Sequence, residues 1–310
     1  MKTYNVIFNP KANRGGSLKS LNILTKYFKE NNMQYIINTT EEPGHATKIA
    51  GEVADKKNQY IVVVGGDGTL FETLNGNNNA TIAIIPVGTG NDVALTLGIP
   101  KKVRAAASYI KNNKTLAIDY ALINNKIKSL SFLSYGISTD IINHMKTIKK
   151  NSRLNYFRAL LYKMFSFKAK EYSIVVNGKE KLVKADFVSI HNCIYAGGGM
   201  QLCKPAVIDD GYLNLLVVTY KSKYRRICNI ISILTKRLHS QPNVSITKVK
   251  NAKINSTETD EVCCIDGELV NINKMDIQVI HKGLNVFVKW WFIYSEMFFM
   301  IYYKVRSFLK

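Results

Sequence analysis

The sequence has few acidic residues and no long apolar segment. It contains 22 aspartate and glutamate residues against 43 lysine and arginine residues, which gives a formal net charge of +21 at pH 7. No apolar run reaches the roughly 20 residues that a membrane-spanning helix needs. A surface this basic is either simply solvated or attracts polyanions, such as nucleic acid, an anionic membrane or nucleotide phosphates.

Several common signatures are also absent. The five cysteines form no CxxC pair and no His–Cys metal spacing, which favours reduced thiols in a cytoplasmic protein. The start of the chain runs directly into a strand-like segment, so no signal peptide is expected. Neither zinc-finger spacing nor another nucleic-acid-binding signature occurs, so we expect no nucleic acid partner. Hydrophobic residues make up 46% of the chain, enough for a packed core.

The first part of the chain alternates between short apolar runs and helical periodicity. Strands are expected at residues 4–9, 34–38, 60–64 and 81–86. Between the first two, Leu18, Leu21, Leu24 and Phe28 are spaced to share one helical face. Helical sequence also follows the other runs, one stretch opening at Pro43. Apolar strands alternating with helices predict an α/β domain, residues 1–122, with a parallel sheet covered by helices on both faces.

After about residue 120 the pattern changes to short strands separated by turn residues. Asn177-Gly178 between two such runs is a strong hairpin signal. Only residues 137–150, 153–167 and 222–238 have helical character. We therefore expect a second, β-rich domain at residues 123–289, an antiparallel sandwich or barrel.

The last segment, residues 290–310, is aromatic and ends in basic residues. Its run from Trp290 to Tyr303 is too short to span a bilayer and contains Glu296. A C-terminal amphipathic helix is expected, which either packs on the protein or lies in a membrane interface. Residues 153–170 and 221–238 combine basic and apolar residues in the same way, and either pack in the core or face an anionic membrane.

Glycines and acidic residues gather where the strands of the first domain end. The third strand runs into Gly65-Gly66-Asp67-Gly68-Thr69, and the fourth into Pro86-Val87-Gly88-Thr89-Gly90-Asn91-Asp92. Ligands of open parallel sheets bind at the carboxyl ends of the strands. Glycine lets backbone N–H groups approach a phosphate closely, and aspartate suits a phosphate that carries Mg²⁺. The alternative is that these glycines only make tight turns. The Walker A and protein-kinase signatures are absent.

Three segments resemble the motifs of the diacylglycerol kinase catalytic-domain family: NPKANRGG, GGDGTLFETLNG and IPVGTGNDVALTLGIP. The likeness continues through IDYALIN, PAVIDDGYLNLLVV and CIDGELV in the second domain. GGDGT alone also occurs in NAD kinases, whereas the PxGTxND element is more specific. The compact length is most similar to the bacterial soluble lipid kinases.

The resemblance implies a role for each matching residue. Glu268 would be the general base, and Asp67 would be catalytic through Mg²⁺. ATP would be bound by Asn9, Pro10, Lys11, Thr40, Gly65, Gly66, Asp67, Gly68, Thr69, Leu70, Phe71, Glu72, Gly88, Thr89 and Asn91. Asp67, Asp92 and Asp119 would organise the catalytic metal, and Val207, Asp210 and Tyr212 a structural metal. Phe71 departs from the family, which usually has Asn there. From the residues alone, Asp266-Gly267-Glu268 predicts a hairpin in which Glu268 is an ordinary turn carboxylate.

The expected protein is an ATP- and Mg²⁺-dependent lipid kinase that phosphorylates diacylglycerol at a membrane surface. Phosphoryl transfer to an alcohol needs a positioned hydroxyl, a metal-neutralised phosphate and a base. Another lipid alcohol, such as a sphingoid base or a polyprenol, is the first alternative. A nucleotide-binding membrane regulator without turnover is the second. A homodimer is left open.

Overall fold

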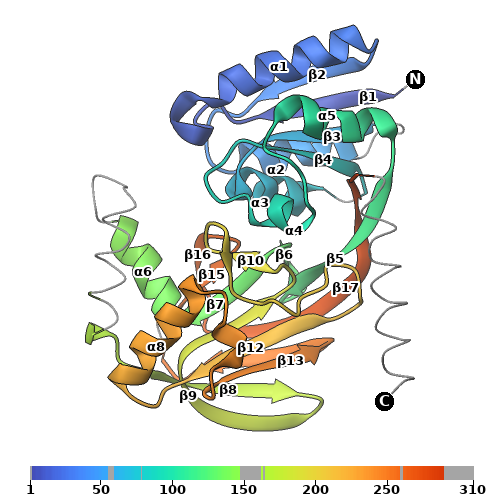
Figure 1. Cartoon of the computed structure of the whole chain (residues 1–310). Coiled ribbons are helices and arrows are strands. Elements are labelled where there is room, and N and C mark those ends of the chain that lie inside the picture. Colours follow the sequence, from blue (N-terminus) through green and yellow to red (C-terminus); the bar gives the residue numbers. More distant parts are fainter. Residues whose placement is uncertain are drawn as a thin grey trace, which may run out of the picture. The chain divides into compact units, whose positions relative to one another are not determined.

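The computed structural model describes residues 2–54, 59–77, 79–146, 162, 165–258 and 261–289. The chain divides into two compact units (Figure 1), one formed by Met1–Ile118 with the segment from Gly283 onward, the other by Asp119–Lys282. The boundary expected after residue 122 falls inside strand β5, Thr115–Ile123. The C-terminal helix expected at 290–310 lies outside the described residues, as does most of the helix expected at 153–167.

The first unit contains the predicted parallel sheet. Its strands are β1 (Thr3–Phe8), β2 (Gln34–Thr39), β3 (Gln59–Gly65) and β4 (Thr81–Pro86). They are hydrogen-bonded in the order β4-β3-β1-β2, and every pairing is parallel. Val286, near the end of β17 (Lys274–Phe287), pairs with Ile82 of β4 and adds a further parallel neighbour. The sequence did not indicate this return of the chain.

Two pairs of helices cover this sheet: α1 packs with α5, and α2 packs with α3 (Figure 1). The helical segments are η1 (Ala12–Gly15), α1 (Ser17–Glu30), α2 (His45–Ala54), α3 (Asp67–Gly76), α4 (Asp92–Thr96) and α5 (Val103–Asn112). Leu21, Leu24 and Phe28 of α1 are buried as expected. All four residues of the expected face lie in α1; Leu18, in its first turn, is 56% exposed.

The second unit is β-rich and antiparallel, as predicted. Its remaining strands are β6 (Ile127–Ser129), β7 (Phe132–Gly136), β8 (Lys170–Val176), β9 (Lys179–His191), β10 (Tyr195–Ala196), β11 (Met200–Gln201), β12 (Leu213–Thr219), β13 (Val244–Val249), β14 (Asn251–Ser256), β15 (Val262–Ile265) and β16 (Glu268–Asn271). Strands β8 and β9 form the hairpin expected from Asn177-Gly178, and both turn residues have positive φ. The far half of β9 lies between β7 and β12.

Two helices accompany this unit, α6 (Ile137–Lys146) and α8 (Lys223–Leu234), and a 3₁₀ turn, η2 (Leu238–Ser240), follows α8. The helix expected over 222–238 therefore ends early, at Leu234. Phe132, Phe187, Leu216 and Val218 belong to the apolar core beneath these helices. Within the described residues, no helix is long and apolar enough to cross a membrane.

Candidate functional site

The two glycine loops of the first unit touch each other through their backbones. A Cβ atom on Gly66 would lie 3.1 Å from Cα of Gly88, and a Cβ on Gly88 would lie 2.6 Å from Cα of Gly66. The contact at Gly88 is closer than real Cβ atoms approach backbone, so this position requires glycine, and the contact at Gly66 would force the neighbouring backbone to shift. Backbone packing therefore explains why glycine occupies these two positions, whether or not the loops also bind phosphate.

Asp67 joins the same two loops. Its carboxylate oxygens accept hydrogen bonds from the backbone N–H groups of Asn91 (2.7 Å) and Asp92 (2.8 Å), at the start of α4. Burial raises the pKa of Asp67, and these backbone hydrogen bonds offset the rise only in part. The contacts make Asp67 a bridge between the loop after β3 and the loop after β4.

Asn91 closes the second glycine loop. It has a left-handed backbone (φ 58°), which asparagine tolerates better than most residues. Its side chain accepts a hydrogen bond from the N–H of Gly88 (3.0 Å) and donates one to the Gly88 carbonyl (2.6 Å). Asn91 and Asp92 are both buried, whereas Thr89 at the tip of the loop is exposed.

Five of the predicted nucleotide-binding residues line one pocket of about 170 Å³. They are Asn9, Lys11, Thr40, Thr69 and Glu72. The Asn9 amide donates to the Thr69 hydroxyl (3.0 Å), which links the end of β1 to the start of α3. The structure thus brings together, at one edge of the sheet, residues that are up to 63 positions apart in the sequence.

Other residues of this pocket were missed from the sequence. Glu41, Glu42 and Pro43 line it as well, and their only signal was that they follow the end of the second strand. The Lys11 ammonium donates to the carbonyl of Glu41 (3.2 Å). The Glu72 carboxylate accepts from the N–H of Ala46 in the first turn of α2 (3.2 Å), so it also stabilises the start of that helix.

The remaining predicted nucleotide residues have local roles. Leu70 is buried in the core of the unit. Gly65 packs against Thr69, whose side chain would lie 2.5 Å from an added Cβ. The carbonyl of Pro10 accepts a hydrogen bond from the Ser17 hydroxyl (3.0 Å). Gly68 and Phe71 lie in the first half of α3, and no contact of the Phe71 side chain explains its difference from the family.

We expect Gly88→Ala to disrupt the predicted nucleotide site. The new methyl group would collide with backbone at Gly66, so the loops must separate, at about 1–3 kcal/mol of unfolding free energy. Affinity for ATP should fall with it. Gly51→Ala is the matched control, because an added Cβ there has its nearest contact at an ordinary 3.6 Å. Chemical denaturation and nucleotide binding of both variants give the comparison; a Gly88→Ala protein that behaves like the control contradicts the packing account.

Asp119 lies in the second unit, where its side chain is completely buried. The carboxylate accepts hydrogen bonds from the N–H groups of Gly211 (2.6 Å) and Lys282 (2.7 Å) and contacts Nδ1 of His281 at 2.8 Å. These contacts give Asp119 a structural task, because they hold the 208–212 loop against β17. Its role at a catalytic metal stays a prediction.

The surroundings of Asp210 do not fit the structural metal implied by the resemblance. One carboxylate oxygen accepts the N–H of Tyr212 (3.0 Å), and the other is ion-paired with the ammonium of Lys248. Lys250 adds a second positive charge, 5.3 Å from the centre of the Tyr212 ring. A metal ion bound by Asp210 with the Val207 and Tyr212 carbonyls would have to displace or repel these ammonium groups. That site stays a prediction that these contacts do not support.

Chelation tests this point directly. If Lys248 neutralises Asp210, excess EDTA should shift the melting temperature of the nucleotide-free protein by less than about 2 °C. A bound structural metal would stabilise the folded state by mass action, and its removal should lower the melting temperature by more than about 4 °C. A fall of more than about 4 °C that is reversed by adding Mg²⁺ or Ca²⁺ would contradict the conclusion that Lys248, and not a metal ion, neutralises Asp210.

Glu268 lies at the start of β16, directly after a tight turn, and its side chain is exposed. The turn is formed by Asp266 and Gly267, which both have positive φ (48° and 96°). Strands β15 and β16 pair on either side of it. The hairpin expected from Asp-Gly-Glu is therefore present, and it presents Glu268 to solvent on an ordered strand.

Asp266 anchors this turn, and its importance was missed from the sequence. Its buried carboxylate accepts the Ser129 hydroxyl (2.7 Å) and the N–H groups of Leu130 (2.8 Å), Ser131 (3.0 Å) and Phe132 (2.9 Å). Burial raises the pKa of Asp266, with these donors opposing the rise. The donors come from a segment more than 130 residues away in the chain, so no local pattern could have indicated them.

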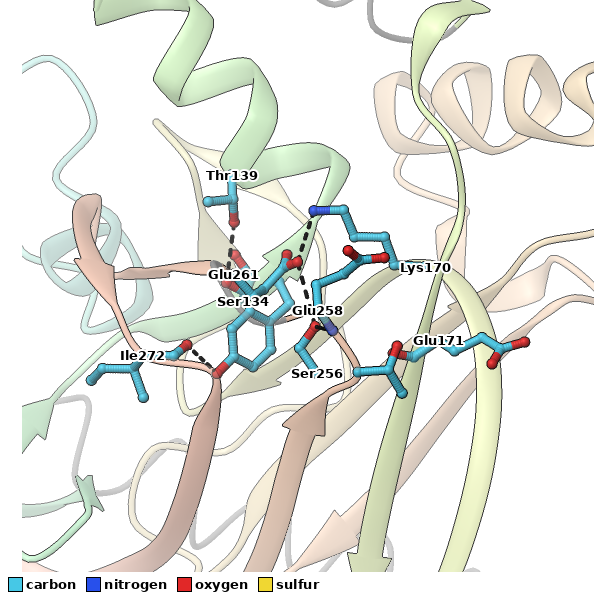
Figure 2. A network of polar contacts seen from close by, with 10 residues as sticks. Ser134, Thr139, Lys170, Glu171, Ser256, Glu258, Glu261 and Ile272 are labelled. Carbon is cyan, nitrogen blue, oxygen red and sulfur yellow. Dashed lines mark hydrogen bonds and ion pairs between the residues drawn. The ribbon is translucent and has the colours of Figure 1, made fainter.

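Further contacts hold both ends of the same hairpin (Figure 2). Just before β15, the buried Glu261 carboxylate pairs with the Lys170 ammonium at 2.7 Å. Just after β16, the carbonyl of Ile272 accepts a hydrogen bond from the Tyr135 hydroxyl (2.6 Å). Together with Asp266 at the turn, these contacts fix the position of Glu268 within its unit.

The second unit also contains an apolar pocket of about 130 Å³ between α6, α8 and the sheet. Its walls are mostly aliphatic and aromatic, including Ile141, Phe187 and Ile233. Its polar lining residues are Ser138, Asp186, Arg226 and Asn229. The Asn229 amide is buried, and neither its nitrogen nor its oxygen has a hydrogen-bond partner among the described residues. The character of this lining suits the hydrocarbon part of a ligand that also carries a hydrogen-bonding group.

Known proteins of one family match this chain along nearly its whole length. Residues 3–123 match the diacylglycerol kinase catalytic domain, and residues 131–288 match the YegS C-terminal NAD kinase beta sandwich-like domain. The chain is 27% identical over 286 residues to a protein named "Diacylglycerol kinase" from Bacillus subtilis, covering 86% of this chain and 90% of that protein. It is 26% identical over 270 residues to "Probable lipid kinase YegS-like" from Yersinia enterocolitica, covering 84% and 88%.

A solved structure shares the fold. The crystal structure of a diacylglycerol kinase from Bacillus anthracis superposes with a TM-score of 0.76 at 26% identity, covering 93% of this chain and 97% of that one. Both domain matches, the relatives and this structure agree on one family. The chain therefore belongs to the diacylglycerol kinase catalytic-domain family and is a lipid kinase with a YegS-type C-terminal domain.

Proposed function

We propose that this lipid kinase transfers the γ-phosphate of ATP, with Mg²⁺, to the free hydroxyl group of diacylglycerol and so forms phosphatidic acid. The observation that carries the proposal is the shared pocket of Asn9, Lys11, Thr40, Thr69 and Glu72 in the first unit. It adjoins the touching glycine loops through Thr69, which packs on Gly65. The relative from Bacillus subtilis bears the name of the same activity.

Each part of this region suits a different part of ATP. The first turn of α3 has no side-chain cap, so its N–H groups are available to phosphate oxygens, which the helix dipole also attracts. Lys11 adds a positive charge. Carboxylates at Glu41, Glu42 and Glu72 would repel phosphate, but they suit the hydroxyl groups of ribose and the amino group of adenine.

Mg²⁺ would be bound mainly through the nucleotide. The described part of the chain contains no group of three or more His, Cys, Asp or Glu side chains that could hold a metal ion. Mg²⁺ prefers to keep several waters and to bind one or two carboxylates together with substrate phosphates. The Asp67 carboxylate accepts the backbone N–H groups of Asn91 and Asp92, and we propose that it holds such an ion through one of the ion's waters. Asp92 is the second carboxylate proposed.

Glu268 is proposed as the general base. An exposed carboxylate on a rigid hairpin can accept the proton of a substrate hydroxyl as the oxygen attacks phosphorus. Leu269, the next residue, packs against the apolar core that also contains Phe187, Leu202 and Val218, and these three residues line the apolar pocket. The base and the pocket therefore belong to one packed region of the second unit.

The apolar pocket is proposed to bind an acyl chain, with Asn229 as its polar contact. A glycerolipid offers ester carbonyl oxygens close to its hydrocarbon chains, and a buried amide without a partner can donate to such an oxygen. Asn229 also lies beside the buried ion pair of Arg226 with Asp186 (2.6 Å). This ion pair makes that end of the pocket polar while its walls stay apolar.

We expect Asn229→Leu to have opposite effects on stability and on lipid binding. Leucine has a similar size but no unsatisfied polar atoms, so the free energy of unfolding should rise by about 1–2 kcal/mol. The lost hydrogen bond should raise KM for diacylglycerol roughly tenfold, with the affinity for ATP unchanged. Denaturation and lipid titrations measure both. A variant that is less stable, or that keeps the KM of the native protein, contradicts this role of Asn229.

A lipid panel tests the proposed function. Purified protein would be incubated with γ-labelled ATP, Mg²⁺ and mixed micelles that contain diacylglycerol, a sphingoid base, a polyprenol, or triacylglycerol as the control without a hydroxyl group. We expect label in phosphatidic acid and none with triacylglycerol. If label appears only in another lipid, that lipid is the substrate and diacylglycerol is not. Tight ATP binding without label in any lipid would favour a regulator that retains the fold.

A further inference from the structure

Helix α8 has its polar and apolar faces reversed relative to a helix on a water-exposed surface. Its buried residues are Arg226, Asn229 and Ser232. Tyr224 is 73% exposed, Ile231 54% and Leu234 68%. A surface helix of a globular protein normally buries its apolar stripe and exposes its polar side. The outer side of α8 is therefore unsuited to water alone.

The exposed apolar residues form one continuous surface. Tyr224, Ile231 and Leu234 are separated by seven and three positions, which places them on the same side of the helix; we call them the α8 apolar face. The Arg226 guanidinium donates to the carbonyl of Phe167 (3.1 Å), which brings the preceding segment against α8. Phe165, two residues before this contact, is 53% exposed.

Positive charges flank this face at both ends. Lys221 and Lys223 are exposed at the start of α8, and Lys236 and Arg237 are exposed just after its end. Residues 221–240 contain no aspartate or glutamate. An apolar face with basic residues around it is the pattern of helices that lie in the interface of an anionic bilayer, where each basic residue near the surface adds to the affinity.

The apolar pocket opens at the same helix. Leu234 lines the pocket while most of its side chain is exposed, and Ile230 and Ile233 continue the lining inward. A lipid that enters past Leu234 would leave the acyl region of a bilayer and reach the pocket without crossing bulk water. Only a lipid surface matches the apolar face, the surrounding charge and the pocket together.

We infer that α8 docks on an anionic lipid bilayer, with Tyr224, Ile231 and Leu234 among the acyl chains and with Lys221, Lys223, Lys236 and Arg237 on the headgroups. The docking also places the mouth of the pocket at the membrane surface. The passage of substrate through that mouth rests on the proposed function; the docking itself does not.

Vesicle flotation of the full chain tests the docking. Neutral phosphatidylcholine vesicles would be compared with vesicles that also contain phosphatidylglycerol. The native protein should bind the anionic vesicles. Tyr224→Glu with Ile231→Glu should lower the partition coefficient at least about tenfold, and Lys221→Gln with Lys223→Gln roughly twentyfold.

Matched controls come from the β8–β9 hairpin, where Leu182 is 61% exposed and Lys179 and Lys181 are also exposed. Leu182→Glu and Lys179→Gln with Lys181→Gln should bind like the native protein.

Kinase assays separate this inference from the proposed function. The Tyr224→Glu, Ile231→Glu protein should lose turnover on vesicle-bound diacylglycerol and keep it on a water-soluble short-chain diacylglycerol. Native protein that phosphorylates neither lipid refutes the proposed function, while flotation still decides the docking. Equal vesicle binding by the native and α8 variants overturns the inference. So does a change from dimer to monomer in sedimentation velocity with vesicle binding unchanged, which would assign the face to a second copy of this chain.

Discussion

Glu268→Gln should lower phosphoryl transfer to lipid by roughly 10²–10⁴-fold, the usual contribution of a general base. Glutamine has the size of glutamate and can still form hydrogen bonds, but its amide does not accept a proton at neutral pH. The effect should fall on kcat, because Glu268 would act on the hydroxyl group as it attacks and not on the bound lipid. Steady-state assays with varied diacylglycerol give kcat and KM separately.

Controls exclude a folding defect as the cause. Glu268 is exposed and forms no ion pair with another residue that the structure describes, so the variant should melt at the native temperature and bind ATP with native affinity. Glu258→Gln is a suitable comparison, since it changes a carboxylate of the same unit outside the hairpin. It should keep nearly full activity. Native kcat in Glu268→Gln would refute the assignment of the base.

Asp266→Ala should cause the largest loss of stability among the variants considered. The substitution leaves the backbone N–H groups of Leu130, Ser131 and Phe132 buried without their acceptor. Each such group costs about 1–3 kcal/mol, so we expect a loss of about 4 kcal/mol overall. Urea denaturation measures it. Asp276→Ala is the matched control, because its ion pair with Lys253 is well exposed on both sides and contributes little.

Asp266→Asn separates anchoring from charge. Its amide oxygen can replace one carboxylate oxygen as an acceptor, whereas its NH₂ group would face N–H donors. We therefore expect an intermediate loss of stability, with kcat lowered because the turn before Glu268 moves and with ATP affinity unchanged. A folded Asp266→Asn protein with native kcat would show that the carboxylate supports the fold without positioning the base.

The raised pKa of Asp266 has a consequence for pH dependence. Because burial raises its pKa in the folded state, the folded protein holds this proton at pH values where the unfolded chain has already released it. The contribution of this group to the unfolding free energy therefore falls as pH rises from the ordinary carboxyl pKa to the raised value. This part of the pH dependence should be absent in Asp266→Ala.

Local signals in the sequence were sufficient for the fold class and for much of the nucleotide pocket. The alternation of apolar strands and helices predicted the parallel sheet, and Asn177-Gly178 predicted the β8–β9 hairpin correctly. In a parallel sheet the strand ends share one edge, so motifs at the ends of β1, β2 and β3 had to converge. Asn9, Thr40 and Thr69 do line one pocket.

Contacts between distant segments could not be predicted in this way. The local pattern indicated only that Asp266 lies in a turn. Its hydrogen-bond donors lie at residues 129–132, far away in the sequence, so the pattern could not indicate them. Helix α8 was recognised as basic and apolar, but which side it buries depends on Asp186 and Phe167, which lie far away in the sequence. The ion-pair partner of Asp210, Lys248, lies in β13. The prediction of a structural metal used only the Asp-Asp-Gly-Tyr segment and therefore did not include this lysine.

The most direct test of the account is to follow the γ-phosphate itself. ATP labelled with ¹⁸O on its γ-phosphate would be mixed with the protein, Mg²⁺ and diacylglycerol, and the lipid product analysed by mass spectrometry. The account predicts phosphatidic acid that carries the labelled phosphate group, formed by the native protein and not by Glu268→Gln. Labelled inorganic phosphate without labelled lipid, from folded protein that binds ATP, would contradict it.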